Sequence, residues 1–171
     1  TFALLVLAGI VFLLRTEALQ VKSVEASGTI QLARADIEAK ASESIASSRH
    51  LFGLIPSSNS LLVDEERIER DISEGFPAVL EVHAHTSLGG KVRIDVSERG
   101  TVAFWCDEGG ESCFQMDADG FLFAPAPMAS GTADKLVFKG MLDQSAATHV
   151  GQKFLSGKEI RVFSDARDLL A

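Results

Sequence analysis

The feature that most constrains the fold of this chain is a pair of strand-like runs joined by a glycine-containing turn. The second run, Lys91–Glu98, alternates strictly between apolar and polar residues, so its two faces differ. Its apolar residues are Val92, Ile94 and Val96. The first run, residues 79–85, is partly apolar, and Gly89 and Gly90 tolerate the positive φ that a hairpin turn needs. The sequence therefore predicts a β-hairpin with one apolar face that other elements must cover.

The segment upstream of the hairpin predicts a first strand and a first helix. Residues 19–26 read as the strand, with Leu19, Val21 and Val24 as its inward side chains. In the helix that follows, apolar residues recur every four positions. They are Ala33, Ile37, Ala41 and Ile45. Ala33 is a poor N-cap, so the start of this helix has no obvious side-chain partner.

A second helix is predicted between Asp64, which can cap its start, and Gly75. Gly75 has the character of a C-cap glycine with positive φ, and Pro77 bars continuation of the helix. We expect Leu61, Ile68 and Ile72 to face the core, and Glu66 to pair with Arg70. The order strand, helix, helix, strand, strand predicts an α+β unit with two helices on one face of a three-stranded sheet.

The chain begins with an uninterrupted apolar segment that ends at Arg15. Its large apolar residues are Phe2, Leu4, Leu5, Val6, Leu7, Ile10, Val11, Phe12, Leu13 and Leu14. The segment is shorter than the roughly 20 residues that span a bilayer, but it lacks the polar stripe of a buried helix. Because the sequence starts at Thr1 without a Met, we expect residues 1–18 to be a membrane anchor truncated at its N-terminus. A signal-peptide core and a buried core helix are the alternatives.

Beyond residue 99 the pattern changes to short strands. A strand at residues 101–106 ends at Cys106, and Cys113 follows a polar loop that contains glycine. Cysteines that flank such a loop can lie opposite one another across a hairpin, within reach of a disulfide. Two unrelated thiols are one alternative, and a zinc site is another, although the spacing differs from the usual C-x2-4-C.

A second hairpin is predicted to turn at Asp119 and Gly120, because Asp-Gly favours a tight turn. A calcium loop at the same place would need further ligands that the sequence lacks. Pro125 and Pro127 are expected to end the second strand of this hairpin, and residues 135–139 form one more strand.

Near the end of the sequence, Ser156 and Glu159 have the spacing of a capping box, which predicts the start of a helix. Ile160, Phe163 and Leu170 lie along one side of that helix.

Composition and motifs exclude several classes of function. A net charge of -8 and a pI near 5.0 argue against nucleic acid as the main partner, and the interspersed charges indicate a solvated surface. His83 and His85 share one face of a strand and could supply two metal ligands, but no third ligand is apparent. No nucleophile with an adjacent base, P-loop or dinucleotide fingerprint is visible. We therefore expect no catalytic residues, no cofactor and no small-molecule substrate.

Several short phrases of the sequence stand out together. They are VKSVE at residues 21–25 with Gly28, LFGLIP at 51–56, Phe76-Pro77, Ser97-Glu98-Arg99, VAFW at 102–105 and DADGFLF at 117–123. In this order and spacing they resemble the FtsQ/DivIB family of bacterial cell-division proteins, and the order of the first unit is similar to that of a POTRA domain. The resemblance implies one membrane helix, a POTRA domain directly outside the membrane, and then a β-rich domain.

On this resemblance, residues 1–18 are expected to be the anchor, residues 19–98 a POTRA domain, and residues 99–171 a β-rich domain that lacks its last strands. The implied function is a non-enzymatic scaffold of the divisome, anchored by a single span in the cell membrane with its soluble region outside the cytoplasm. The implied partners are other single-span division proteins, similar to FtsB/DivIC and FtsL.

Exposed sheet edges allow partner segments to add as strands, and Leu136, Val137 and Phe138 are the candidate edge. Two alternatives remain open at this point. One is a POTRA-containing component of outer-membrane assembly or secretion. The other is an extracytoplasmic metal-binding protein that uses His83, His85 and the two cysteines.

Overall fold

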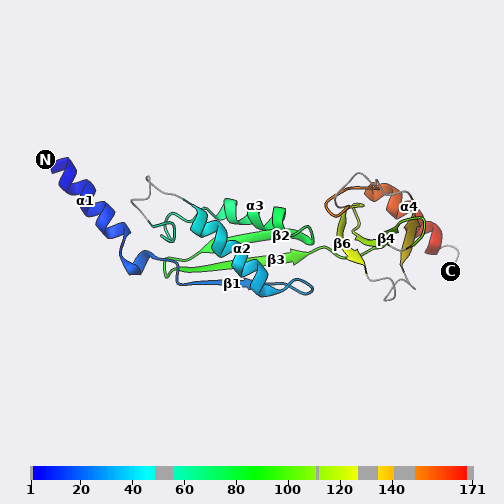
Figure 1. The fold of residues 1–171 in the computed structure, drawn as a ribbon, viewed down its shortest axis with the longest axis horizontal. Coiled ribbons are helices and arrows are strands. Elements are labelled where there is room, and N and C mark those ends of the chain that lie inside the picture. The colour runs from blue at the N-terminus through cyan, green and yellow to red at the C-terminus, as the bar shows by residue number, and fades with distance from the viewer. Residues whose placement is uncertain (1, 49–55, 111, 127–134, 141–148, 169–171) are drawn as a thin grey trace. The chain divides into compact units, whose positions relative to one another are not determined.

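The computed structural model describes residues 2–48, 56–110, 112–126, 135–140 and 149–168. Within these residues the chain is a mixed α+β protein with two sheets and four α-helices (Figure 1). It divides into two compact units, Thr1–Glu98 and Arg99–Ala171. Some positions named in the sequence analysis lie outside the described residues. They are His50, residues 51–55, Pro127 and Leu170.

The first unit has the predicted order of strand, helix, helix, strand, strand. Its elements are α1 (Phe2–Leu14), a 3-10 turn (Glu17–Leu19), β1 (Ser23–Ser27), α2 (Arg34–Ser47), α3 (Glu65–Gly75), β2 (Val79–Thr86) and β3 (Lys91–Glu98). The sheet order is β1-β3-β2, in which β1 runs parallel and β2 antiparallel to the central strand β3. Both β1 and β2 are therefore edge strands.

One face of this sheet is covered by α2 and α3, because both helices contribute apolar stripes to a single core. The buried residues are Ile37, Ala41 and Ile45 on α2, Ile68 and Ile72 on α3, Val92, Ile94 and Val96 on β3, Ala26 on β1, and Val79, Val82 and Ala84 on β2. The strict alternation of β3 thus predicted its buried face correctly. The small side chain of Ala41 leaves room for α2 to lie close to the sheet.

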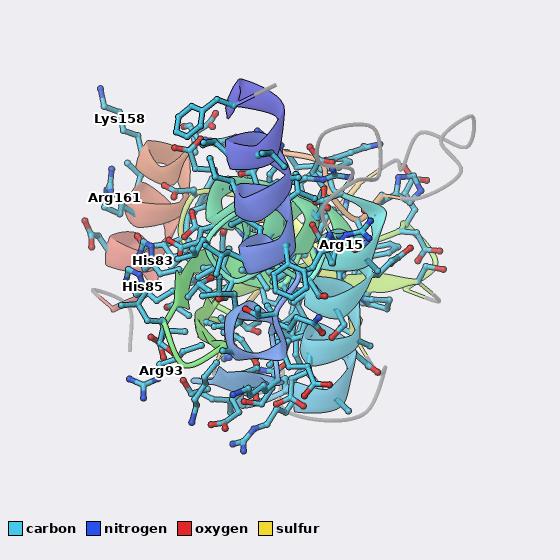
Figure 2. The ribbon with its side chains drawn as sticks, turned by 90° about the vertical axis from the view of Figure 1, so that its left-hand side faces the viewer. Arg15, His83, His85, Arg93, Lys158 and Arg161 are labelled. Atoms are coloured by element: carbon cyan, nitrogen blue, oxygen red, sulfur yellow. A yellow bond between two sulfur atoms is a disulfide. The ribbon has the colours of Figure 1, made fainter. Side chains whose placement is uncertain are left out.

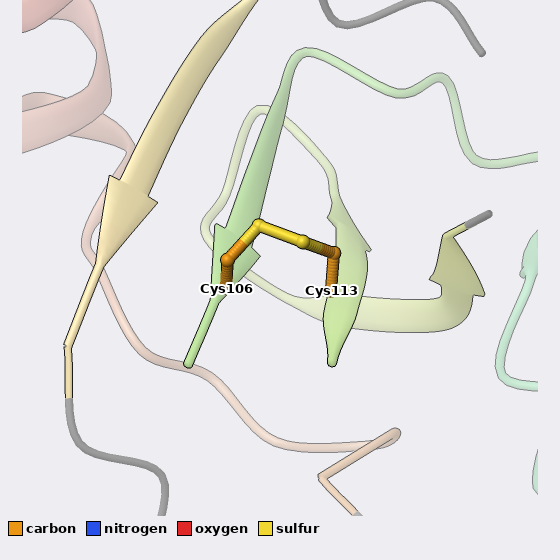
Figure 3. The surroundings of a disulfide bond; sticks show 2 residues. All are labelled: Cys106 and Cys113. Carbon is orange, nitrogen blue, oxygen red and sulfur yellow. A yellow bond between two sulfur atoms is a disulfide. The ribbon is translucent and has the colours of Figure 1, made fainter. Parts of the chain in front are cut away.

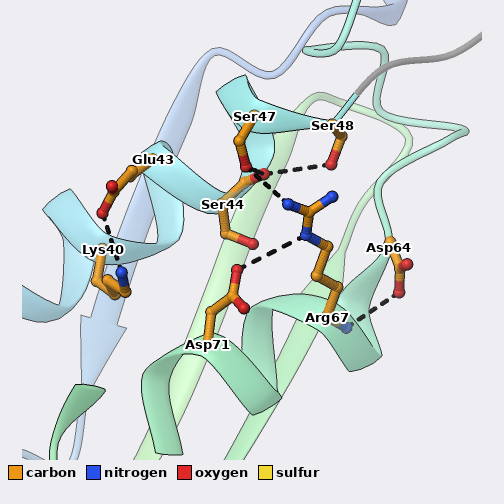
Figure 4. Close-up of polar contacts among 8 residues, drawn as sticks. All are labelled: Lys40, Glu43, Ser44, Ser47, Ser48, Asp64, Arg67 and Asp71. Carbon is orange, nitrogen blue, oxygen red and sulfur yellow. Dashed lines mark hydrogen bonds and ion pairs between the residues drawn. The ribbon is translucent and has the colours of Figure 1, made fainter. Parts of the chain in front are cut away.

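Polar contacts join α2 and α3 at their solvent-facing side (Figure 4). The Arg67 guanidinium donates to Ser47 Oγ at 2.9 Å and lies 3.7 Å from the Asp71 carboxylate. Asp64 accepts from the backbone N–H of Arg67 at 3.0 Å, which confirms it as the N-cap of α3. The i,i+4 ion pair observed on α3 is this Arg67–Asp71 pair, in place of the predicted pairing of residues 66 and 70.

The first strand is shorter than residues 19–26, and Leu19 is not one of its inward residues. Leu19 ends the 3-10 turn, and its carbonyl accepts from Ser60 N–H at 2.7 Å. Val21 N–H donates to the Ser58 carbonyl at 2.7 Å. Backbone groups of residues 19–21 are therefore hydrogen-bonded to the segment before α3, and β1 pairs with β3 only further along the chain.

Two other predictions about α3 were wrong. Leu61 lies before the helix in a turn held by the Asn59 side chain, and it is 50% exposed. Gly75 is the last helical residue and is not among the positive-φ glycines, and Phe76 takes the C-cap position with φ -131° and ψ 89°. Gly90 does have positive φ, and a Cβ there would clash with the Gln20 carbonyl oxygen, so the hairpin turn requires glycine at this place.

Helix α1 carries all ten large apolar residues that were expected to form an anchor. Phe2, Leu5 and Phe12 are each at least 72% exposed, so large apolar side chains lie open along the helix. The Asn59 side-chain amide, itself fully buried, donates to the Leu14 carbonyl and ties the end of α1 to the loop before α3. Among the described residues, no helix has both the length and the hydropathy of a membrane span.

The second unit contains a four-stranded sheet and one helix. Its elements are β4 (Ala103–Cys106), β5 (Cys113–Met116), β6 (Leu122–Ala126), β7 (Leu136–Lys139) and α4 (Gly157–Asp168). The strand order is β6-β5-β4-β7, antiparallel except for the parallel pair β4–β7. Its core consists of Ala103, Met116, Leu122 and Ile160, with Trp105, Phe114, Leu136, Phe138, Phe154 and Leu155 packed around them.

The predicted end of a strand at Pro125 was wrong, since Pro125 lies inside β6 opposite Phe114. A proline is tolerated there because β6 is an edge strand of the sheet in the described residues. The predicted capping box is confirmed. Ser156 N–H and Oγ both contact Glu159 Oε2 at 2.7 Å, and Glu159 N–H donates back to Ser156 Oγ at 3.3 Å. These bonds, first from the backbone and then from the hydroxyl of Ser156, lower the pKa of Glu159.

Candidate partner-binding edge

Strand β7, which contains Leu136, Val137 and Phe138, lies at one end of the second sheet. Leu136 and Phe138 point into the core cluster, while Val137 is 42% exposed on the other face. The Phe138 ring lies 6.3 Å from the ring of Trp105 and 5.4 Å from that of Phe163 on α4. Aromatic packing therefore holds β7 to the sheet from one side.

The direction of the backbone groups of β7 follows from its pairing with β4. Gly140 N–H, just beyond the strand, donates to the Cys106 carbonyl at 3.2 Å. Successive residues of a strand direct their backbone groups to opposite sides. The backbone N–H and C=O of Phe138 therefore point toward β4, whereas those of Val137 and Lys139 point outward. Among the residues that the structure describes, these outward groups have no hydrogen-bond partner. Within the described residues, the outer edge of β7 is therefore not paired with another strand.

The opposite edge of the same sheet, at β6, is occupied. Leu122 N–H donates to the Gln152 carbonyl at 2.8 Å, and Gly151 N–H donates to the Leu122 carbonyl at 2.7 Å. Phe121 and Lys153 form a further antiparallel bridge. The segment that precedes α4 thus runs along the start of β6, and Pro125 removes a donor further on.

A disulfide between Cys106 and Cys113 joins β4 to β5 beside the candidate edge (Figure 3). The two residues are direct cross-strand partners with a Cα–Cα distance of 4.1 Å, and Cys106 also pairs with Lys139 of β7. The bond therefore fixes the end of the strand on which β7 rests.

The turn between β5 and β6 is built around a partly buried ion pair. Arg99 Nη1 lies 2.6 Å from Asp117 Oδ2, and the Arg99 guanidinium stacks over the Phe121 ring at 4.4 Å. Asp117 Oδ1 accepts from the N–H groups of Asp119 and Phe121 at 2.9 and 3.0 Å. Both carboxylate oxygens are thus used within the fold, which gives this acidic turn a structural role.

Glu98, the neighbour of Arg99 in sequence, accepts from three consecutive backbone N–H groups in the first unit. Its carboxylate lies 2.6 Å from Ile30 N, 2.9 Å from Gln31 N and 3.1 Å from Leu32 N. Burial raises the pKa of Glu98, but these three bonds together outweigh it and hold the pKa below its usual range. Glu98 thereby orders the segment that leads into α2, whose N-cap Ala33 has no side-chain bond.

The histidines considered as metal ligands lie on the exposed face of the first sheet (Figure 2). His83 is paired with Asp95 across the hairpin and His85 with Arg93, and His83 Nδ1 is 4.0 Å from a Glu69 carboxylate oxygen. Within the described part of the chain, no group of three or more His, Cys, Asp or Glu side chains could hold a metal ion.

Within the described residues, the geometry defines a two-unit α+β protein in which the outer edge of β7 has no paired strand. Compared with known proteins, the sequence matches no family model and no curated protein.

Proposed function

We propose that this chain is a membrane-anchored scaffold of the FtsQ/DivIB type, which works without catalysis by holding other single-span division proteins at the septum. The observation that carries the proposal is the outer edge of β7, whose outward backbone groups have no hydrogen-bond partner among the described residues. A scaffold of this kind needs a surface that accepts a partner segment, and main-chain hydrogen bonds to an edge strand provide affinity without a pocket. FtsB/DivIC-like and FtsL-like proteins are the proposed partners.

Three further features support the proposal. The first unit has the strand and helix order of a POTRA domain. Two charged residues of the resembling phrases, Glu98 and Arg99, each hold a backbone or a turn in place, in the first and the second unit respectively. The exposed apolar side chains of α1 suit contact with lipid, so we propose that α1 belongs to a membrane anchor and that both units lie on the extracytoplasmic side.

Proline substitution at neighbouring positions of β7 tests the edge. Val137→Pro removes an outward donor and leaves the bonds to β4 in place, so we expect the protein to fold and to lose co-purification of its division partners from detergent-solubilised membranes. Phe138→Pro removes a donor to β4 and should destabilise the second unit itself. Val137→Ala keeps the N–H and serves as the matched control.

Trp105 emission reports whether the second unit remains folded in each variant, since its ring lies in that core. A folded Val137→Pro protein that still recruits its partners at the parental level would rule out β7 as the binding edge. Topology is tested separately, with a reporter active only outside the cytoplasm and fused after Ala171. Reporter activity in the cytoplasm would contradict the anchored, extracytoplasmic arrangement.

A further inference from the structure

Both edge strands of the first sheet have backbone N–H groups that donate to glutamate side chains. On β2, Ala84 N–H donates to Glu69 Oε1 at 2.8 Å and Thr86 N–H donates to Glu65 Oε1 at 2.6 Å. On β1, Ala26 N–H donates to Glu38 Oε1 at 3.0 Å. These carboxylates come from the helices that cover the sheet, α3 and α2, and they take the place of a neighbouring strand.

The spacing on β2 explains how one helix can serve two edge donors. Glu65 and Glu69 are four residues apart on α3, which places them about 6 Å apart along the helix. Ala84 and Thr86 are two residues apart on β2, about 6.8 Å along the strand, and both direct their N–H groups outward. A helix that runs beside the strand therefore brings successive carboxylates to successive outward donors.

On the edge of β1, the outward N–H groups on either side of a short unpaired stretch have hydrogen-bond partners. Val21 N–H is taken by the Ser58 carbonyl and Ala26 N–H by Glu38. Between them Val24 borders a groove that is also lined by Ile45 and Ala46 of α2. The unpaired stretch is too short for a regular strand to pair along β1 without displacing Glu38.

We infer that Glu38, Glu65 and Glu69 form a carboxylate cover that prevents the first sheet from adding strands, and that the strand excluded at β2 is β2 of a second copy of this chain. Strand β2 has eight residues, long enough for antiparallel pairing about a twofold axis. An incoming strand would have to displace two charge-assisted hydrogen bonds before it could form its own. The inference is independent of the proposed function, because it concerns the edges of the other unit.

Removal of the acceptors at β2 tests this inference in the full chain, kept in detergent that covers α1. We expect Glu65→Ala combined with Glu69→Ala to self-associate at least about tenfold more tightly than the parent in sedimentation velocity. Glu65→Gln combined with Glu69→Gln retains carbonyl acceptors and should behave as the parent. Glu66→Ala combined with Glu74→Ala removes the same charge from α3 without touching β2, and it should also behave as the parent.

Backbone amide hydrogen exchange locates the effect. In the single variant Glu69→Ala, Ala84 N–H should exchange faster at low protein concentration while Thr86 N–H, still held by Glu65, stays protected. This measurement keeps the inference testable if the double Ala variant does not fold. Unchanged exchange at Ala84, or Gln variants that associate as tightly as the Ala variants, would overturn the role of these carboxylates as acceptors.

Discussion

The two sheets of this protein treat their edges differently. The first has helices beside both edge strands, and their glutamates occupy outward N–H groups on β1 and β2. The second has its β6 edge covered by the segment before α4, and its β7 edge has no hydrogen-bond partner among the described residues. On β1, β2 and the start of β6, edge protection thus depends on which element runs beside the strand, whereas Pro125 protects β6 through the strand's own sequence. We propose that partners bind at this β7 edge of the second unit.

Replacing Ile94 by Asp should produce the largest difference in stability between the two units. Ile94 is fully buried in the first core, so the variant leaves a carboxylate there without a partner. We expect the free energy of unfolding of the first unit to fall by about 3–5 kcal/mol, which is enough to unfold that unit. Trp105 is the single Trp of the chain and belongs to the second core, so its emission should remain native while circular dichroism falls.

The matched control for that experiment is Arg93→Asp, which places the same side chain at the exposed neighbouring position of β3. Both units should remain folded in this variant. A change of Trp105 emission in Ile94→Asp would show instead that the two units unfold together.

Loss of the disulfide should act on the second unit alone. Closing the short loop between Cys106 and Cys113 is expected to stabilise that unit by at most about 2–3 kcal/mol. Reduction, or Cys106→Ser combined with Cys113→Ser, should lower the melting temperature followed by Trp105 emission. Mass spectrometry of a non-reduced digest checks the bond in protein from its native compartment. Reductant should have no effect on the double Ser variant, and free thiols in the freshly isolated parent would contradict the pairing.

Acid should weaken each unit through a different glutamate. The pKa values of Glu98 and Glu159 are lower in the folded protein than in the unfolded chain. Each contribution is therefore present above the ordinary pKa near 4.5 and is lost as the pH falls through the lower folded value. Glu98→Gln should flatten the acid limb of the first unit, by less than about 1 kcal/mol because solvent screens the group. Glu159→Gln should flatten only that of the second unit, as followed by Trp105 emission. Identical acid limbs in parent and variants would contradict this assignment.

The smallest effect is expected on the exposed face of the first sheet. Replacing both His83 and His85 by Ala should leave stability unchanged, because both side chains lie on the exposed face of β2. Under the proposed function, septum localisation and cell division should also be unchanged. Complementation of a strain depleted of the parent protein measures this. If the double variant is folded but the cells that carry it fail to divide, a metal-binding or catalytic role for this face would be favoured.

The pattern of apolar residues predicted the first unit well, because burial on one side of a strand or helix leaves a direct period in the sequence. Val92, Ile94 and Val96 on β3, and Ile68 and Ile72 on α3, all lie in the predicted core. The same reasoning failed where backbone partners decide the structure. Leu19 was drawn into a turn by bonds to the segment before α3, which no local pattern reveals.

The glutamates were the main feature that sequence reasoning missed. Interspersed charges indicated a solvated surface, yet Glu38, Glu65, Glu69 and Glu98 each accept from backbone N–H groups. The i,i+4 spacing of Glu65 and Glu69 was the available signal, but it acquires meaning only once β2 is known to lie beside α3. The position of residues 136–138 in a strand was predictable, whereas its place at the end of the sheet depends on long-range pairing with β4.

The pairing of the two cysteines also has a practical consequence for chemistry on this protein. Because the chain has two cysteines and the disulfide joins them, the oxidised protein offers no competing thiol among its own residues. In this oxidised chain, a cysteine introduced at Val137 would provide a single free thiol, to which a maleimide could attach a photo-crosslinker. Such a probe would sit on β7 and would attach covalently to whichever segment docks there, so that the sequence of that segment could be read directly by mass spectrometry.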